Sequence, residues 1–295
     1  MDTLTLNSFA KVNLYLQVLR KRKDNYHTIS TLFERIDLHD TIHLAARPDR
    51  TLRIISESKD IPHDATNLAY RSARLLQDTF CVQKGADIKI IKRIPVGSGM
   101  GGGSSNAACV LAGLNRLWKL HLGRKALLAL AKKLGADVPF FIYDTPFAYA
   151  GGVGEKIKPL PALGKVRLWH VVAVPRIHVS TPLIYQAWDE LVMKKKVKLT
   201  RRKNSVKLLT LALKKKDISL IGKSLFNALE PVTVSKYPYV RTVRERLAQQ
   251  GLAAILMSGS GPTVYALVSS RKEALSVYAQ LKAESHWQVF VTRTC

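Results

Sequence analysis

The chain has 295 residues, 47% of them hydrophobic, enough for one large domain or two medium ones. No apolar run approaches the length of a membrane span, and the first residues lack the basic and apolar regions of a signal peptide. The cysteines, Cys81, Cys109 and Cys295, lie far apart and show no metal-binding spacing. We therefore expect a protein of the cytoplasm, without disulfides and without a membrane partner.

The charge is strongly basic, with 47 lysines and arginines against 21 acidic residues and a net charge of +26. Such an excess attracts nucleic acid, anionic membranes or phosphorylated small molecules. The basic residues cluster at 21–23, 194–196, 201–203 and 214–216, but aromatic residues do not alternate with them as in a platform for single-stranded nucleic acid. A solvated basic face is therefore favoured over a nucleic-acid site, and the segment 194–216 receives no role.

The N-terminal part of the chain predicts strands. Residues 3–7 alternate between apolar and polar, and residues 11–18 do so more clearly, which places Lys11 and Asn13 together on the polar face. Spacing alone favours solvent-exposed strand residues for this pair. Further strands are expected over residues 27–33, 36–44 and 51–56.

The segment Asp24-Asn25-Tyr26-His27 predicts a turn, because Asp and Asn side chains bond readily to nearby backbone groups. Tyr26 and His27 then lie at its exit. Such a pair can stack on a nucleobase and bond its edge, or it can pack against the core, and the second case is the commoner one for an arbitrary Tyr-His pair.

The segment Pro95–Ala108 contains five glycines and three serines and leads into an apolar helix. Side chains are nearly absent, so backbone N–H groups can approach an anion closely, and a helix N-terminus adds partial positive charge. We predict an anion cradle, with phosphate as the expected anion. A flexible linker is the alternative, but linkers rarely run directly into an apolar helix. No lysine follows the last glycine as in a Walker A loop.

The elements around this loop follow from periodicity and capping signals. A helix over 64–80, capped by Asp64 or Thr66, and a strand over 86–94 precede the loop. Ser104 or Ser105 is the expected cap of the helix that follows it. The later expected elements are a helix over 124–134 closed by Gly135, a glycine-rich turn at 150–155, a strand over 166–174, a helix over 181–193, an exposed loop at 194–203, helices over 206–213, 218–229 and 240–249, strands over 252–257 and 263–268 around a tight loop at 258–262, a helix over 271–284 and a strand over 287–292.

Asp137, in the segment Gly135–Phe141, has two interpretations. It can cap a short helix that carries Pro139 in its first turn, or it can be a buried carboxylate that faces a substrate. The spacing favours the cap, although the two roles can coexist.

Four stretches together resemble the motifs of the GHMP superfamily of small-molecule kinases. They are residues 10–14 (Ala-Lys-Val-Asn-Leu), Pro95–Ala108, Gly135–Phe141 and Met257–Thr263, and they occur in the family's order over nearly the whole chain. Two more segments, Asp24–His27 and Gly152–Glu155, resemble the members that phosphorylate diphosphocytidyl-methylerythritol. Asn25 stands where glycine is usual, and asparagine tolerates left-handed backbone.

The resemblance implies an α+β protein of two domains with the active site in the cleft between them. Residues 1–160 would form an ATP-binding α/β domain like the second domain of ribosomal protein S5, and residues 161–295 a ferredoxin-like α+β domain. The implied reaction transfers the γ-phosphate of ATP to the 2-hydroxyl of the methylerythritol group, in the non-mevalonate route to isopentenyl diphosphate. Mg²⁺ is expected with ATP, and the chain is expected to be a monomer or a weak homodimer.

The resemblance also assigns residues. Asp137 matches the catalytic base and Lys11 its electrostatic partner. The residues matched to the substrate are Asn13, which positions it, Tyr26 and His27, which recognise cytidine, Thr181, and Tyr185, which stacks on cytosine where the family more often has phenylalanine. The residues matched to ATP are Pro95, Val96, Gly97, Ser98, Gly99, Met100, Gly101, Gly102, Gly103, Ser104 and Ser105. No metal ligand is assigned, although Ser105 is a candidate contact.

Two alternatives remain at this point. Another GHMP kinase, for homoserine, mevalonate or a sugar, would share the phosphate loop but would have no use for Tyr26, His27 and Tyr185 as base-binding residues. A nucleic-acid-binding protein without kinase activity is suggested by charge alone, and is less favoured because charge does not require these motifs.

Overall fold

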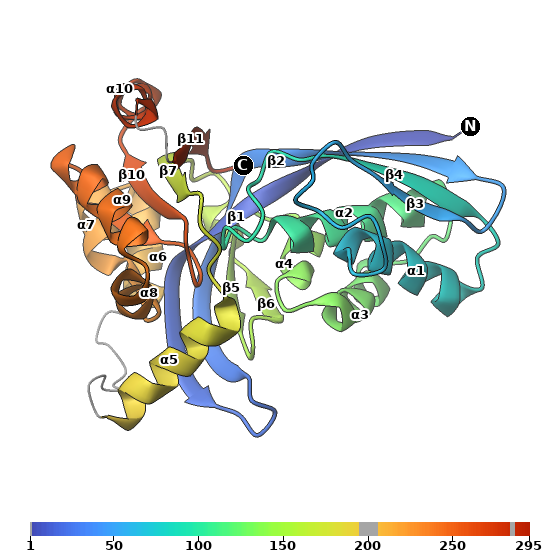
Figure 1. Cartoon of the computed structure of the whole chain (residues 1–295), viewed down its shortest axis with the longest axis horizontal. Helices are drawn as coiled ribbons and strands as arrows, with labels where there is room; N and C mark the ends of the chain where they lie inside the picture. Colours follow the sequence, from blue (N-terminus) through green and yellow to red (C-terminus); the bar gives the residue numbers. More distant parts are fainter. Residues whose placement is uncertain (1, 195–205, 284–286) are drawn as a thin grey trace.

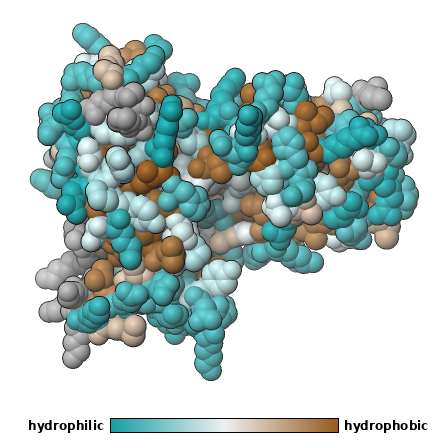
Figure 2. Space-filling view, viewed as in Figure 1, coloured by the Kyte–Doolittle hydropathy of each residue, from teal (hydrophilic) through white to brown (hydrophobic). Residues whose placement is uncertain are grey.

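The structure is a computed structural model that describes residues 2–194, 206–283 and 287–295. It has two halves side by side, each built on a β-sheet with helices packed against it (Figure 1). Hydrophilic residues are spread over both halves on the face shown in Figure 2. Among the described helices, none is both long and apolar enough to cross a bilayer.

The first sheet has seven strands in the order β3-β4-β2-β1-β8, and β5 pairs with both β2 and β6. The four strands predicted over residues 3–18 and 27–44 are wrong in number, because they form only two long strands. Register shifts at Phe9/Ala10 and Asn13/Tyr15 interrupt the alternation, which is why the pattern breaks while the strand continues. The strands are β1 (Thr3–Lys21), β2 (His27–Arg47), β3 (Leu52–Ile55), β4 (Gly85–Ile91), β5 (Phe147–Gly151), β6 (Lys156–Pro159) and β8 (Phe226–Asn227).

Four helices cover one face of this sheet (Figure 1). Asn67 caps the first of them by accepting a hydrogen bond from Ala69 N at 2.9 Å, so the caps predicted at Asp64 and Thr66 are wrong. The predicted helix over 124–134 has the expected bounds and ends at Gly135. The four helices are α1 (Leu68–Phe80), α2 (Gly102–Leu117), α3 (Arg124–Leu134) and α4 (Val138–Ile142).

The second sheet is antiparallel, with the order β11-β7-β10-β9. Its first strand in the chain lies between the fourth and the third, which is the ferredoxin-like arrangement and confirms that expectation. The helix predicted over 218–229 is too long, because it ends at Ser224 and the chain then enters β8. The predicted loop 194–203 lies outside the described residues except for Lys194. The elements are β7 (Trp169–Pro175), β9 (Ile255–Met257), β10 (Val264–Val268), β11 (Trp287–Arg293), α5 (Thr181–Met193), α6 (Val206–Lys215), α7 (Ile218–Ser224), α8 (Glu230–Lys236), α9 (Pro238–Gln249), α10 (Arg271–Lys282) and a 3₁₀ turn at Pro161–Leu163.

The two halves share a buried core. Leu14 and Ile36 of the first sheet belong to the same apolar cluster as Val172 and Leu256 of the second. The hydroxyl of Tyr265 donates to the Asn13 carbonyl at 2.9 Å. These contacts hold β1, the strand that carries Lys11 and Asn13, against the second half, and the cavity described next lies along this junction.

Candidate active site

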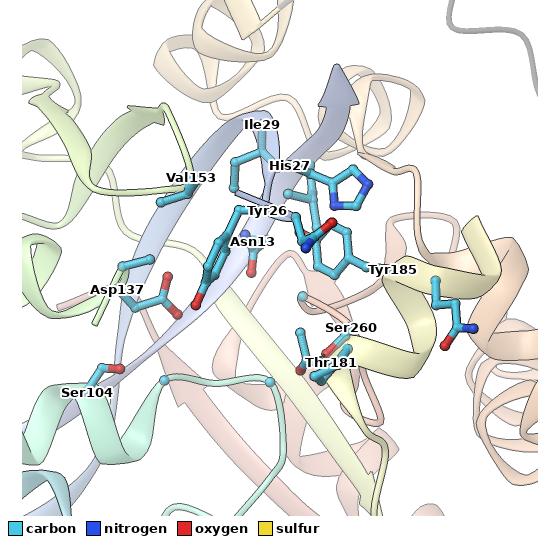
Figure 3. Close-up of a pocket in the computed structure, with 18 of the residues that line it drawn as sticks. Asn13, Tyr26, His27, Ile29, Ser104, Asp137, Val153, Thr181, Tyr185 and Ser260 are labelled. Carbon is cyan, nitrogen blue, oxygen red and sulfur yellow. Dashed lines mark hydrogen bonds between the residues drawn. The ribbon is translucent and has the colours of Figure 1, made fainter. Parts of the chain in front are cut away.

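A cavity of about 610 Å³ lies between the two halves. Asp137 and Ser104 lie on one side of it, with Tyr185, Thr181 and Ser260 on the other (Figure 3). From the phosphate loop, glycines 99 and 101 line it together with Ser104. Every residue that the sequence assigned outside this loop also lines it: Lys11, Asn13, Tyr26, His27, Asp137, Thr181 and Tyr185.

The glycine-rich loop turns directly into α2. Gly101 occupies the cap position with φ +70°, and no side chain caps the helix, so the caps predicted at Ser104 and Ser105 are wrong. A Cβ at Gly101 would lie 3.2 Å from Lys11 Cγ, so only glycine combines this backbone with such close approach. The first N–H groups of a 16-residue helix have no acceptor within it and can bind an anion.

A buried polar network connects the start of α2 to β1 and β2. Asp40 accepts hydrogen bonds from Lys92 Nζ at 2.7 Å and from Asn106 Nδ2 at 3.0 Å. Ser8 donates to the Ser105 hydroxyl at 2.8 Å. Ser105 is therefore buried in this network, and Ser104 is the serine of the pair that lines the cavity.

Lys11 and Asp137 lie side by side in the wall of the cavity. Lys11 Nζ is 3.4 Å from Asp137 Oδ2, and the two side chains are 6% and 31% exposed. Asp137 occupies the N-cap position of α4, but its side chain makes no capping bond, so the favoured interpretation as a cap is wrong. The carboxylate instead points toward the cavity, with one oxygen beside the ammonium.

Lys11 is held in a single place by its surroundings. Its ammonium donates to Asn13 Oδ1 at 2.8 Å and lies 4.9 Å from the centre of the Phe33 ring. Asn13 donates in turn to Thr31 Oγ1 at 2.8 Å. Lys11 and Asn13 are both buried, which contradicts the exposed face that alternation favoured. Gly101 of the phosphate loop packs against Lys11, and Gly259 of the 258–262 loop lies against Asn13. Spacing within a strand carries no information about such contacts.

Aromatic side chains gather at the other end of the cavity. The His27 and Tyr185 rings stack with centroids 4.9 Å apart, and Trp188 meets His27 edge-on at 5.7 Å. Tyr26 is 64% exposed, and in Figure 3 its side chain is drawn between Asp137 and Tyr185. Asn25 has φ +64°, so asparagine does adopt the left-handed backbone expected where the family has glycine.

Sequence reasoning missed several residues of the cavity. Asp189 accepts hydrogen bonds from His27 Nε2 at 2.6 Å and from Lys21 Nζ at 2.8 Å. Ser260 shares a 2.7 Å hydrogen bond with Thr181. Asp189 follows Tyr185 by four residues in a helix whose bounds were predicted correctly, and this spacing puts both on one face. That signal was available in the sequence. Ser260 lies in the motif segment Met257–Thr263 but received no role, and nothing local pointed to Lys21.

Comparison with known proteins places this site in a family. The GHMP kinases N terminal domain matches residues 67–145, and the GHMP kinases C terminal domain matches residues 209–286. A 4-diphosphocytidyl-2-C-methyl-D-erythritol kinase of Geobacillus sp. (strain WCH70) is 41% identical over 292 residues, covering 98% of this chain and 96% of the relative. The chain belongs to the 4-diphosphocytidyl-2-C-methyl-D-erythritol kinase family. It is a phosphotransferase of the GHMP kinase fold that uses ATP.

Two solved structures resemble this chain, one in both sequence and fold and the other in fold alone. The crystal structure of a 4-(cytidine 5'-diphospho)-2C-methyl-D-erythritol kinase has a TM-score of 0.79 and 34% identity, and the match covers 99% of this chain and 100% of that one. The mevalonate kinase of L. major has a TM-score of 0.77 with only 17% identity, covering 99% and 96%. The second likeness shows a shared fold alone. Another GHMP kinase is therefore the less favoured alternative.

The described residues that line the cavity include oxygen-bearing side chains, but these do not form a dense group of metal-ligating residues. Over the described ranges, no group of three or more His, Cys, Asp or Glu side chains could hold a metal ion. Mg²⁺ needs less than this, because it commonly binds through one or two carboxylates together with substrate phosphates and water. Ser104 lines the cavity and can add a hydroxyl oxygen to a shell supplied mostly by phosphates and water.

Proposed function

We propose that this chain transfers the γ-phosphate of ATP to the 2-hydroxyl of 4-diphosphocytidyl-2-C-methyl-D-erythritol. The observation that carries the proposal is the Lys11–Asp137 pair, which faces the glycine-rich loop in a cavity that also holds Tyr26, His27 and Tyr185. One end of this cavity suits phosphates, and the other suits a flat base. The relatives that carry the kinase's name extend over nearly the whole chain.

In this proposal, the residues from Pro95 to Ser105 hold the ATP phosphates through backbone N–H groups at the start of α2. Asp137 accepts the proton of the attacking hydroxyl, since one of its oxygens is free of hydrogen bonds from described side chains. Lys11 attracts the incoming phosphoryl oxygens, and Asn13 and Thr31 keep its ammonium in place. Phosphoryl transfer depends mainly on such positioning and charge stabilisation.

Ser104, together with the ATP phosphates and water, would hold Mg²⁺ in the cavity. The ion would neutralise charge on the phosphate oxygens. Tyr26, His27, Thr181 and Tyr185 bind the cytidine side of the substrate.

The decisive experiment is a kinase assay with ATP, Mg²⁺ and diphosphocytidyl-methylerythritol, with mevalonate and homoserine as control acceptors. We expect ADP and the 2-phosphate from the first acceptor only. Turnover of either control at a comparable rate, with none of the diphosphocytidyl compound, would overturn the proposal in favour of another GHMP kinase.

Further expectations accompany this function. We propose a division into an ATP-binding domain over 1–160 and a second domain over 161–295, although β8 of the second range pairs with β1 of the first. The chain is expected to be a monomer or weak homodimer without a specific nucleic-acid partner, in the cytoplasm. Sedimentation at several concentrations tests the first point, and salt-dependent DNA and RNA binding tests the second.

A further inference from the structure

The base-binding end of the cavity holds a carboxylate that the proposed reaction does not use. Asp189 lies on α5, one turn after Tyr185. Its Oδ1 is 2.6 Å from His27 Nε2, and its Oδ2 is 2.8 Å from Lys21 Nζ. Each oxygen of this carboxylate therefore has a fixed partner, and the two partners pair with each other on either side of the β1–β2 turn.

The charge state of Asp189 decides which nitrogen of His27 carries hydrogen. Burial acts to raise the pKa of Asp189, but the hydrogen bonds from Lys21 and His27 outweigh it and hold the pKa below its usual range. The ionised carboxylate can only accept hydrogen bonds. The Nε2 atom of His27 must then carry a hydrogen.

The other ring nitrogen of His27 is open to a ligand. None of the residues that the structure describes forms a hydrogen bond with Nδ1. The buried side-chain nitrogen and oxygen atoms that lack a partner do not include Nδ1 either. Tyr185 covers one face of the ring and Trp188 meets its edge, so packing restricts the ring's rotation. Because His27 lines the cavity, Nδ1 is the nitrogen left for a bound base.

We propose that Asp189, together with Lys21, is a positioning residue that holds His27 as the neutral Nε2–H tautomer, so that Nδ1 accepts a hydrogen bond from the amino group of cytosine. The inference rests on the proposed function, because it concerns how that site selects its base. Lys21 Nζ, 2.8 Å from Asp189 Oδ2, already supplies a positive charge to this carboxylate. Cytosine offers an amino donor where uracil offers a carbonyl acceptor, which would face the Nδ1 lone pair. The arrangement therefore favours cytosine over uracil.

The test compares two substrates, diphosphocytidyl-methylerythritol and its diphosphouridyl counterpart, in the full-length wild type, Asp189→Asn and Glu190→Gln. An amide at position 189 can donate to Nε2 as well as accept from it, so control of the tautomer is lost. We expect Asp189→Asn to raise KM for the cytidyl substrate roughly tenfold, the worth of one hydrogen bond, and to lower the cytidyl preference by a similar factor. The kcat and the KM for ATP should stay near the wild-type values.

Glu190→Gln is the matched control, because it removes the same charge from the next, exposed position of the same helix. It should leave both KM values and the base preference unchanged. A folded Asp189→Asn variant with wild-type KM and wild-type preference would overturn the proposal.

Nitrogen-15 NMR of the labelled wild type measures the tautomer of His27 directly. The only variant that this measurement needs is His27→Gln, which assigns the signal. We expect His27 to be neutral with hydrogen on Nε2, and to become a mixture of tautomers in Asp189→Asn. A wild-type His27 with hydrogen on Nδ1, either alone or together with Nε2, would contradict the proposal even if Asp189→Asn did not fold.

The two proposals fail in distinguishable ways. If the wild type phosphorylates neither substrate, the proposed function fails. Calorimetric binding of cytidine 5′-diphosphate against uridine 5′-diphosphate would then test Asp189 alone. Tighter cytidine binding that weakens in Asp189→Asn would support the positioning role, and equal binding of both nucleotides would reject it.

Discussion

Asp137 and Asp189 lie in the same cavity, and each lies beside a lysine, but their oxygens are used differently. The Asp137 side chain is 31% exposed, and its one charged neighbour among the described residues is Lys11 at 3.4 Å. The Asp189 side chain is 15% exposed, and both its oxygens are within 2.8 Å of a donor. A carboxylate with an open oxygen can accept a proton from a substrate, whereas one with both oxygens occupied can only hold its neighbours in place.

The same contrast separates the two ends of the cavity. On the side of Asp137 the lining includes Gly101, Ser104 and Ala136, which leave room for phosphates. Around Asp189 it is aromatic and already packed, as the His27–Tyr185 stack shows. We therefore expect changes at the first end to alter kcat and changes at the second to alter KM for the nucleotide substrate.

The largest effect is expected for Asp137→Asn. The amide keeps the volume but cannot act as a base, so kcat should fall by about 10²–10⁴-fold while KM for the cytidyl substrate changes little. Steady-state kinetics measure both values. Asp78→Asn, in an exposed carboxylate of α1, is the control and should behave as wild type. Near-normal turnover by Asp137→Asn would remove Asp137 from the catalytic role.

Lys11→Met should follow, with kcat reduced by about 10²–10³-fold, because one preorganised donor to the transferred phosphoryl group is lost. Binding of cytidine nucleotides should stay nearly intact, as calorimetry can measure. Lys132→Met, on the exposed face of α3, controls for the lost charge. If Lys11→Met instead fails to fold, the buried lysine is needed for stability, and its effect on kcat cannot be assigned to the phosphate end of the cavity.

Tyr185→Ala tests the opposite end. Loss of base stacking is worth about 1–3 kcal/mol, so KM for the cytidyl substrate should rise about 5- to 150-fold with a smaller change in kcat. Tyr185→Phe keeps the ring and should bind like wild type. A fall in kcat alone would show that the two ends are not separable in the way we propose.

The smallest effect is expected for Gly101→Ala. Its φ of +70° costs a residue with a Cβ about 1–2 kcal/mol, and the new methyl group presses on Lys11. The free energy of unfolding in urea should fall by that amount, and kcat should fall several-fold. Gly103→Ala, two residues further on in the first turn of α2, is the matched control, since its Cβ would meet only Leu68 Cδ1 at an ordinary 3.7 Å. Equal effects from both substitutions would contradict a special role for Gly101.

Local features were predictable because they depend on neighbours in the chain. The helix over 181–193 matched α5 residue for residue, since periodicity and the Ser-Thr-Pro start are local signals. The cap of α2 was not predictable in this way. Serine is the usual cap, but here a left-handed glycine begins the helix, and Ser105 is drawn into the network of Ser8 and Asp40 from β1 and β2.

By itself, the sequence determined that a glycine-rich loop enters a helix, that Lys11 and Asn13 share one face of a strand, and that its motifs resemble one superfamily. Only the tertiary structure decided that this face is buried, that Asp137 pairs with Lys11 and does not cap α4, and that Asp189 bonds to His27. The physical reason is that burial and ion pairing depend on which segments meet in space, and the partners of these side chains lie far away along the chain.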